Sequence, residues 1–149
     1  MRDIIDHTIA EICSRRRFGR VTCRLATGEF ATSSQSVVDV VDNFVSEFGF
    51  VGLGGKWVEV SKSQAKAIGQ EILSRDLAYR LQIMPESDAS SLAERFTPFF
   101  GIGLRCFTNG NIVLSTVSSE LVPGAWNPIS AATCVDGSQI GILWVEDED

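Results

Sequence analysis

Residues 126–149, WNPISAATCVDGSQIGILWVEDED, decide the fold that we predict for this chain. They predict two β-strands, over 133–135 and 140–145, because β-branched residues are frequent in both and the second also contains Trp144. Asp136 and Gly137 lie between the strands, and this pair favours a tight hairpin turn. We therefore expect an antiparallel strand pair at this point of the chain.

Further strand signals precede this hairpin. Asn109-Gly110 is a strong turn signal between a predicted strand at 102–106 and a return strand that begins at Ile112. Alternating apolar and polar residues predict a half-buried strand over 20–26, and a short strand is predicted over 57–60. Most of the predicted sheet thus comes from the C-terminal third of the chain.

Apolar residues at three- and four-residue spacing predict helices over 2–16, 61–79 and 87–96. Another helix is predicted to begin at Ser33, Ser34 or Ser36 and to extend to Phe48. Ser61 and Gln64 have the spacing of a capping box. The predicted fold class is α+β, with an antiparallel sheet and three or four helices packed on one of its faces, in a single domain of residues 1–149.

The net charge of −6 is unevenly distributed along the chain. Residues 1–80 contain 11 basic and 10 acidic residues, whereas residues 81–149 contain 2 basic and 9 acidic residues. This distribution argues against nucleic acid as the partner, because phosphate binding needs a basic face. It allows a basic protein partner, attracted over long range by the acidic half. The run Arg15-Arg16-Arg17 is interpreted as a solvated helix end.

The composition also predicts a compartment. The chain has no apolar run of roughly 20 residues that could span a bilayer. Asp3 and Asp6 lie where a signal peptide needs basic residues followed by apolar ones. We therefore expect a cytoplasmic protein without membrane association. Its four widely spaced cysteines are expected to be reduced and mostly buried.

No catalytic motif is present in the sequence. The glycine-rich stretch GFVGLGGK, residues 49–56, fails the spacing of a phosphate-binding loop and is interpreted as a flexible connection. His7, the one histidine, lies on a predicted helix and is expected to have a structural or surface role. Cysteine and histidine do not occur at metal-ligand spacing. We predict no catalytic residue, no metal, no cofactor and no enzymatic activity.

Two features have both a structural and a functional interpretation. The acidic run 146–149 is either a solubilising tail or a mimic of nucleic-acid phosphates that docks into a basic cleft. Trp57, Trp126 and Trp144 are either core residues or interface hot spots, where tryptophan is over-represented.

The segments WNPIS (126–130), ATCVDG (132–137) and LWVEDED (143–149) resemble small cytosolic bacterial immunity proteins. Such proteins are encoded beside polymorphic toxins, including those of contact-dependent growth inhibition. The resemblance implies stoichiometric, tight binding to the C-terminal toxin domain of a neighbouring effector, often a nuclease. Neutralisation would then occur at the toxin's active site or at an adjacent exosite.

From this we predict a set of partner-binding residues: Glu120, Trp126, Asp136, Trp144, Glu146, Asp147, Glu148 and Asp149. The alternatives are a small-ligand-binding protein or an enzyme with a pocket between helices and sheet, and a structural adaptor without charge steering. A pocket with convergent polar groups and perturbed titratable residues would favour the ligand-binding alternative. A solid core with a flat acidic face would favour the protein-binding one.

Overall fold

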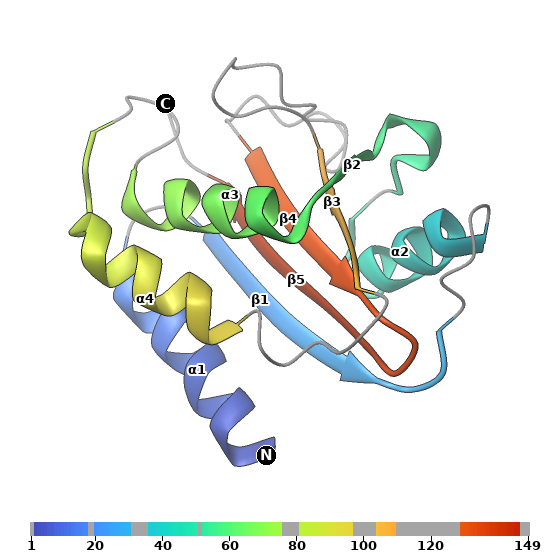
Figure 1. The fold of residues 1–149 in the computed structure, drawn as a ribbon, viewed down its shortest axis with the longest axis horizontal. Helices are drawn as coiled ribbons and strands as arrows, with labels where there is room; N and C mark the ends of the chain where they lie inside the picture. Colours follow the sequence, from blue (N-terminus) through green and yellow to red (C-terminus); the bar gives the residue numbers. More distant parts are fainter. Residues whose placement is uncertain are drawn as a thin grey trace.

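The C-terminal hairpin lies inside the sheet. In a computed structural model the strands have the order β1-β5-β4-β3-β2, and all neighbouring strands are antiparallel (Figure 1). The structure describes residues 2–17, 20–30, 36–50, 52–75, 81–96, 104–109 and 129–146. Within them the strands are β1 (Arg20–Thr27), β2 (Val58–Val60), β3 (Arg105–Thr108), β4 (Ile129–Val135) and β5 (Gln139–Glu146). The helices are α1 (Arg2–Arg15), α2 (Ser36–Ser46), α3 (Lys62–Ser74) and α4 (Glu86–Phe96), and a 3₁₀ turn, η1, covers Gly54–Lys56.

Strand β5 is paired on both sides over its length. Its register with β1 extends from Arg20 opposite Glu146 to Thr27 opposite Gln139. On its other side it pairs with β4, where Val135 lies opposite Ile140 at the turn. The predicted hairpin at Asp136-Gly137 is therefore confirmed. Because β1 and β4 both hydrogen-bond to β5, its backbone donors and acceptors are satisfied within the sheet.

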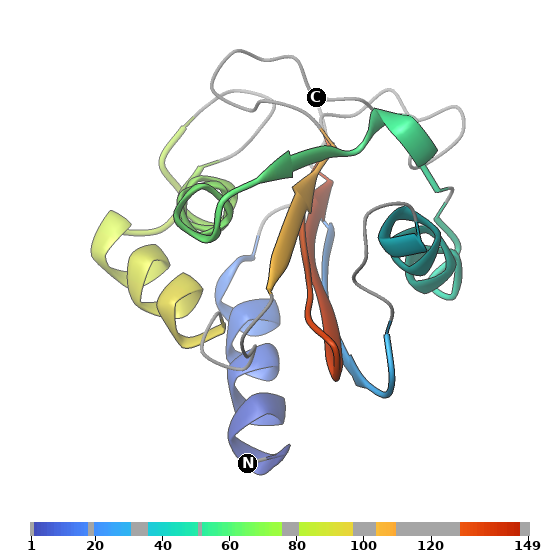
Figure 2. The ribbon, with the colours of Figure 1, turned by 45° about the vertical axis from the view of Figure 1, so that its right-hand side comes forward.

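Side chains of β5 are buried on both faces of the sheet. Ile140, Ile142 and Trp144 belong to a core that includes residues of α2. Leu143 and Val145 point to the opposite face, into a core with residues of α1, α3 and α4. Figure 2 shows α2 on one side of the sheet and the other three helices on the opposite side. The α+β class is confirmed: three helices share one face, as expected, and α2 covers the other.

The start of α3 follows its sequence signal. The Ser61 hydroxyl accepts a hydrogen bond from the Gln64 backbone N–H at 3.1 Å, and the Gln64 side chain accepts one from the Ser61 N–H at 2.8 Å. This is the predicted capping box. It satisfies two backbone donors that the first turn of a helix leaves without intrahelical acceptors.

Helix α3 ends earlier than predicted, at Ser74. Arg16 is buried and donates from Nε to the Ile72 carbonyl at 2.6 Å and from Nη2 to the Arg75 carbonyl at 2.9 Å. A guanidinium at this position binds the carbonyl oxygens that a helix C-terminus leaves without partners. The interpretation of Arg16 as part of a solvated helix end was therefore wrong. Asn109 is the last described residue of its segment, so Gly110 of the predicted turn and the return strand after it lie outside the described residues.

Candidate functional site

Asp136, predicted to contact a partner, forms the hairpin turn. Its Oδ1 accepts hydrogen bonds from the Ser138 N–H at 2.7 Å, the Gln139 N–H at 2.7 Å and the Ser138 hydroxyl at 3.2 Å. Only 2% of the residue is exposed. An aspartate that accepts bonds from the backbone two and three residues later stabilises a turn. The carboxylate is thus used within the hairpin, and we leave Asp136 out of the proposed partner surface.

Trp144 lies in the core of the α2 face. It is 0% exposed, and its ring stacks on Phe50 with a centroid distance of 3.6 Å and an interplanar angle of 8°. Among the described residues its indole Nε1 has no hydrogen-bond partner. A side chain without exposed surface cannot contact a partner unless the core opens, so we also leave Trp144 out of the partner surface.

The other predicted partner residues lie at or beyond the ends of the described segments. Glu146 is the last residue of β5, where its backbone is paired with Arg20 and Ile129. Its side chain, together with the rest of the predicted set, is outside the described part of the chain: Glu120, Trp126, Asp147, Glu148 and Asp149. The structure therefore places the start of the acidic run on an ordered strand.

Acidic residues of α4 are paired with basic residues of the N-terminal half. Asp88 Oδ2 lies 2.8 Å from Arg15 Nη2, and Glu94 Oε1 lies 2.8 Å from Lys66 Nζ. Glu86 Oε1 lies 3.3 Å from Arg75 Nη2. These pairs neutralise part of the charge difference between the two halves of the sequence. The acids of the C-terminal half outside α4 and the hairpin turn are Glu120 and residues 146–149.

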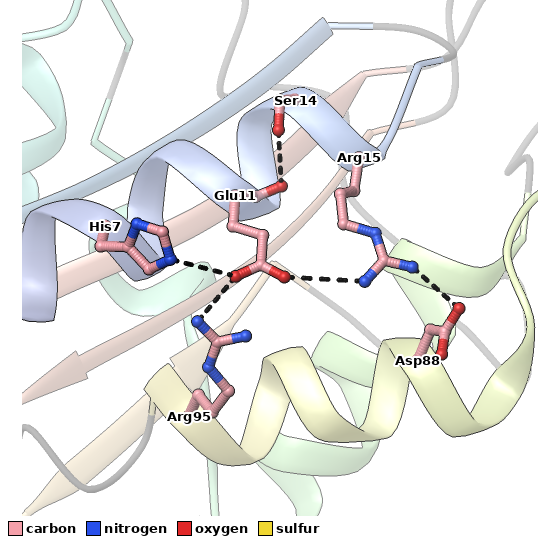
Figure 3. A network of polar contacts seen from close by, with 6 residues as sticks. All are labelled: His7, Glu11, Ser14, Arg15, Asp88 and Arg95. Carbon is pink, nitrogen blue, oxygen red and sulfur yellow. Dashed lines mark hydrogen bonds and ion pairs between the residues drawn. The ribbon is translucent and has the colours of Figure 1, made fainter.

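A second set of polar contacts joins α1 to α4 (Figure 3). Glu11 Oε2 lies 2.7 Å from Arg95 Nη2 and 3.8 Å from His7 Nε2, and Glu11 Oε1 lies 3.6 Å from Arg15 Nη1. The hydrogen bond from Arg95 lowers the pKa of Glu11, and the neighbouring charges add to this effect. His7 is exposed, in agreement with its predicted surface role. These contacts form an ion-pair cluster, centred on Glu11, that joins α1 to α4.

Replacing Glu11 by glutamine is expected to lower the free energy of unfolding more at neutral pH than at acidic pH. The folded-state pKa of Glu11 is lowered from its usual 4.5, so ionised Glu11 stabilises the folded state above that value. The stabilisation is lost as the pH falls through the lowered pKa. The difference in unfolding free energy between wild type and Glu11→Gln should therefore shrink on acidification, as measured by urea denaturation at several pH values. Glu29→Gln, at an exposed position after β1, is the control; an equal pH dependence in both variants would contradict the assignment.

The glycine-rich stretch is held by Asp42 of α2. Asp42 Oδ1 accepts a hydrogen bond from Trp57 Nε1 at 2.7 Å, and Oδ2 accepts one from the Gly54 N–H at 3.1 Å. A Cβ atom at Gly52 would lie 2.4 Å from Asp42 Cγ, and Gly54 has a positive φ of 55°. The stretch connects two elements, as predicted, but a carboxylate fixes it. The Gly54 N–H that an anion would need is already bound to Asp42.

A groove of about 320 Å³ lies between α2 and the end of β1. Its polar lining is Thr27, Asn43 and Glu47, and Phe30 and Phe44 contribute apolar surface. Among the described residues, shifted pKa values include those of Glu11, Glu59, Arg105 and the buried cysteines, and none of these groups lines the groove. Arg105 lowers the pKa of Glu59 through hydrogen bonds of 2.7 and 2.9 Å to its carboxylate. An ion pair between β2 and β3 accounts for this shift.

The chain was compared with protein-family models, curated proteins and solved structures. No protein-family model, curated protein or solved structure matches the chain. Among the described residues, no helix is long and apolar enough to cross a membrane. The same residues contain no cluster of three or more histidine, cysteine or acidic side chains that could hold a metal ion. The resemblance to immunity proteins therefore stays a prediction.

Proposed function

We propose that the chain is a non-catalytic binding protein that neutralises a cognate toxin domain, in the manner of the immunity proteins that its C-terminal stretch resembles. The observation that best supports the proposal is the placement of its acidic residues. In the C-terminal half, the acids of α4 form ion pairs and Asp136 forms a turn. The acids that follow them in the chain are concentrated in the run 146–149.

The run continues from the strand with the most extensive pairing in the fold. Backbone pairing with Arg20 and Ile129 fixes Glu146, the first residue of the acidic run. A charged segment that begins at a fixed point loses less conformational entropy on binding than one on a loose linker. Its negative charge accelerates encounter with a basic surface, such as the substrate cleft of a nuclease.

A growth assay tests this function. The proposal predicts that the gene directly upstream encodes a large secreted protein with a toxic C-terminal domain. Expression of that domain alone should stop growth, and co-expression of this chain should restore it. A toxin domain from an unrelated locus serves as the specificity control. Failure of the folded chain to protect against the adjacent toxin domain would contradict the proposal.

The acidic run supplies a more specific prediction. Replacing Asp147, Glu148 and Asp149 together by asparagine, glutamine and asparagine should lower the association rate and weaken partner binding about tenfold at low salt, because an ion pair in contact with water contributes up to about 1 kcal/mol. The loss should diminish at high salt, where charges are screened. Surface plasmon resonance with the toxin domain measures both quantities. Glu29→Gln, beside the hairpin turn at the other end of β5, is the control.

Unchanged binding by the triple variant at low salt would exclude the acidic run as the contact surface. It would leave toxin binding itself intact, so the growth assay and the binding measurement separate the two claims.

A small-ligand-binding protein is the second candidate, and the groove beside α2 is the observation that favours it. Its volume is at the lower end of the range for ligand pockets, roughly 300–1,000 Å³. Ligand binding to the folded state raises Tm. A metabolite that raises Tm of the wild type but not of Asn43→Leu would favour this candidate over the toxin-binding proposal.

A further inference from the structure

Two cysteines that are distant in sequence lie opposite one another in the sheet. Cys106 of β3 is paired in register with Cys134 of β4, and their Sγ atoms are 3.1 Å apart. Both side chains belong to the core beneath α3. We propose that this pair is a redox modification site, at which hydrogen peroxide converts the two thiols into a reversible disulfide. The proposal is independent of the function proposed above.

The backbone already has the geometry that a disulfide needs. Directly opposed residues of antiparallel strands have Cα atoms about 4.5–5.5 Å apart. This range lies within the Cα separation of disulfides, about 4.4–6.8 Å. Bond formation therefore requires only that the two sulfur atoms approach from 3.1 Å to about 2.05 Å. Small side-chain rotations achieve this without a change of register.

The two thiols differ in reactivity. The hydrogen bond between the two thiols lowers the pKa of Cys106; burial opposes this shift, and the positive charge of Lys62 adds to it. The same hydrogen bond, together with burial, raises the pKa of Cys134. Since the thiolate is the nucleophile, we expect Cys106 to react before Cys134. Burial raises the pKa of Cys23, which makes this thiol a poor competitor.

The reaction with peroxide is balanced without a further reactant. The Cys106 thiolate attacks one peroxide oxygen, the O–O bond breaks, and Cys106 sulfenic acid and hydroxide form. The Cys134 sulfur then attacks the Cys106 sulfur, forms the S–S bond and expels the sulfenic oxygen as hydroxide. The thiol protons convert both hydroxides to water. Two thiols and one peroxide thus give one disulfide and two water molecules, with two electrons passing from sulfur to peroxide.

Access to the pair is through the edge of the sheet. Cys106 and Cys134 are only 2% and 3% exposed, so the oxidant must enter during local opening. Cys106 pairs on its outer side with Val60 of β2, an edge strand of three residues. Short edge strands open at lower free energy than central strands. A small oxidant such as hydrogen peroxide fits this route, and the disulfide would join β3 covalently to β4.

Peptide mapping tests the proposal on the folded wild-type protein. The protein is treated with hydrogen peroxide, quenched, alkylated under denaturing conditions and digested, and the peptides are identified by mass spectrometry. We expect a cross-linked peptide joining Cys106 to Cys134, two fewer alkylated thiols, and full reversal by dithiothreitol. Cys13→Ser should leave the yield of this cross-link unchanged.

The order of reaction has its own readout. Cys134→Ser should stop the reaction at Cys106 sulfenic acid, which dimedone traps. If this variant fails to fold, peptide mapping of the wild-type protein, which needs no substitution, still tests whether the disulfide forms. Absence of the Cys106–Cys134 cross-link after peroxide treatment of the folded protein would overturn the proposal, as would a cross-link that joins Cys13 to Cys23 in its place.

Discussion

Replacing Trp144 by alanine is expected to lower the free energy of unfolding by about 3–5 kcal/mol. The side chain has no exposed surface and stacks on Phe50 at 3.6 Å, in the core between α2 and the sheet. Its removal leaves a cavity that a central strand, fixed on both sides, cannot close. Urea denaturation followed by circular dichroism measures the loss.

Trp144→Phe is the matched control for this prediction. Phenylalanine retains an aromatic ring opposite Phe50. Among the described residues no group accepts a hydrogen bond from the indole Nε1, so the change leaves no acceptor unpaired there. We expect a cost of about 1–2 kcal/mol, below that of Trp144→Ala, because the smaller change in volume leaves a smaller cavity. A Trp144→Ala variant as stable as wild type would place the ring at the surface and restore the interface interpretation of this residue.

Asp42→Ala is expected to lower the free energy of unfolding by about 2–4 kcal/mol. The change removes the acceptor of two hydrogen bonds, from the Gly54 N–H and from Trp57 Nε1. Hydrogen bonds to a charged group contribute about 1.5–3 kcal/mol each, and a buried donor left without a partner adds a desolvation cost. Asp42→Asn retains one carboxamide oxygen and should show an intermediate loss in the same denaturation experiment.

A double-mutant cycle assigns the loss to the Asp42–Trp57 contact. Trp57→Phe removes the Nε1 donor and keeps an aromatic ring in the core. In the Asp42→Ala background this second change should cost about 1–2 kcal/mol less than in wild type, because the hydrogen bond is already absent. Additive effects of the two substitutions would show that the contact does not stabilise the loop.

Elements with a local signal could be predicted from the sequence. The capping box at Ser61 and the turn at Asp136-Gly137 depend on residues two or three positions apart, and both are present in the structure. Helix α2 lies on the face of the sheet opposite to α1, α3 and α4. The sequence signal for this arrangement is in β5, whose residues 140–145 are apolar without alternation. Such a continuous apolar run is typical of a strand buried on both faces. This run therefore indicates that helices cover both faces of the sheet.

The candidate site was harder to predict because its determinants are distant in sequence. The pairing of Asp88 with Arg15, and of Glu94 with Lys66, joins helices that no local pattern brings together. A charge count along the sequence therefore overestimates the acidic surface of the C-terminal half. Likewise, the residue type of Trp144 is compatible with both core and interface, and only its packing against Phe50 distinguishes them.

The most direct test of the proposed function is isothermal titration calorimetry between the purified chain and the toxin domain encoded directly upstream. The proposal predicts a one-to-one complex whose affinity falls as the salt concentration rises. The absence of binding at low salt, with both proteins folded, would contradict it.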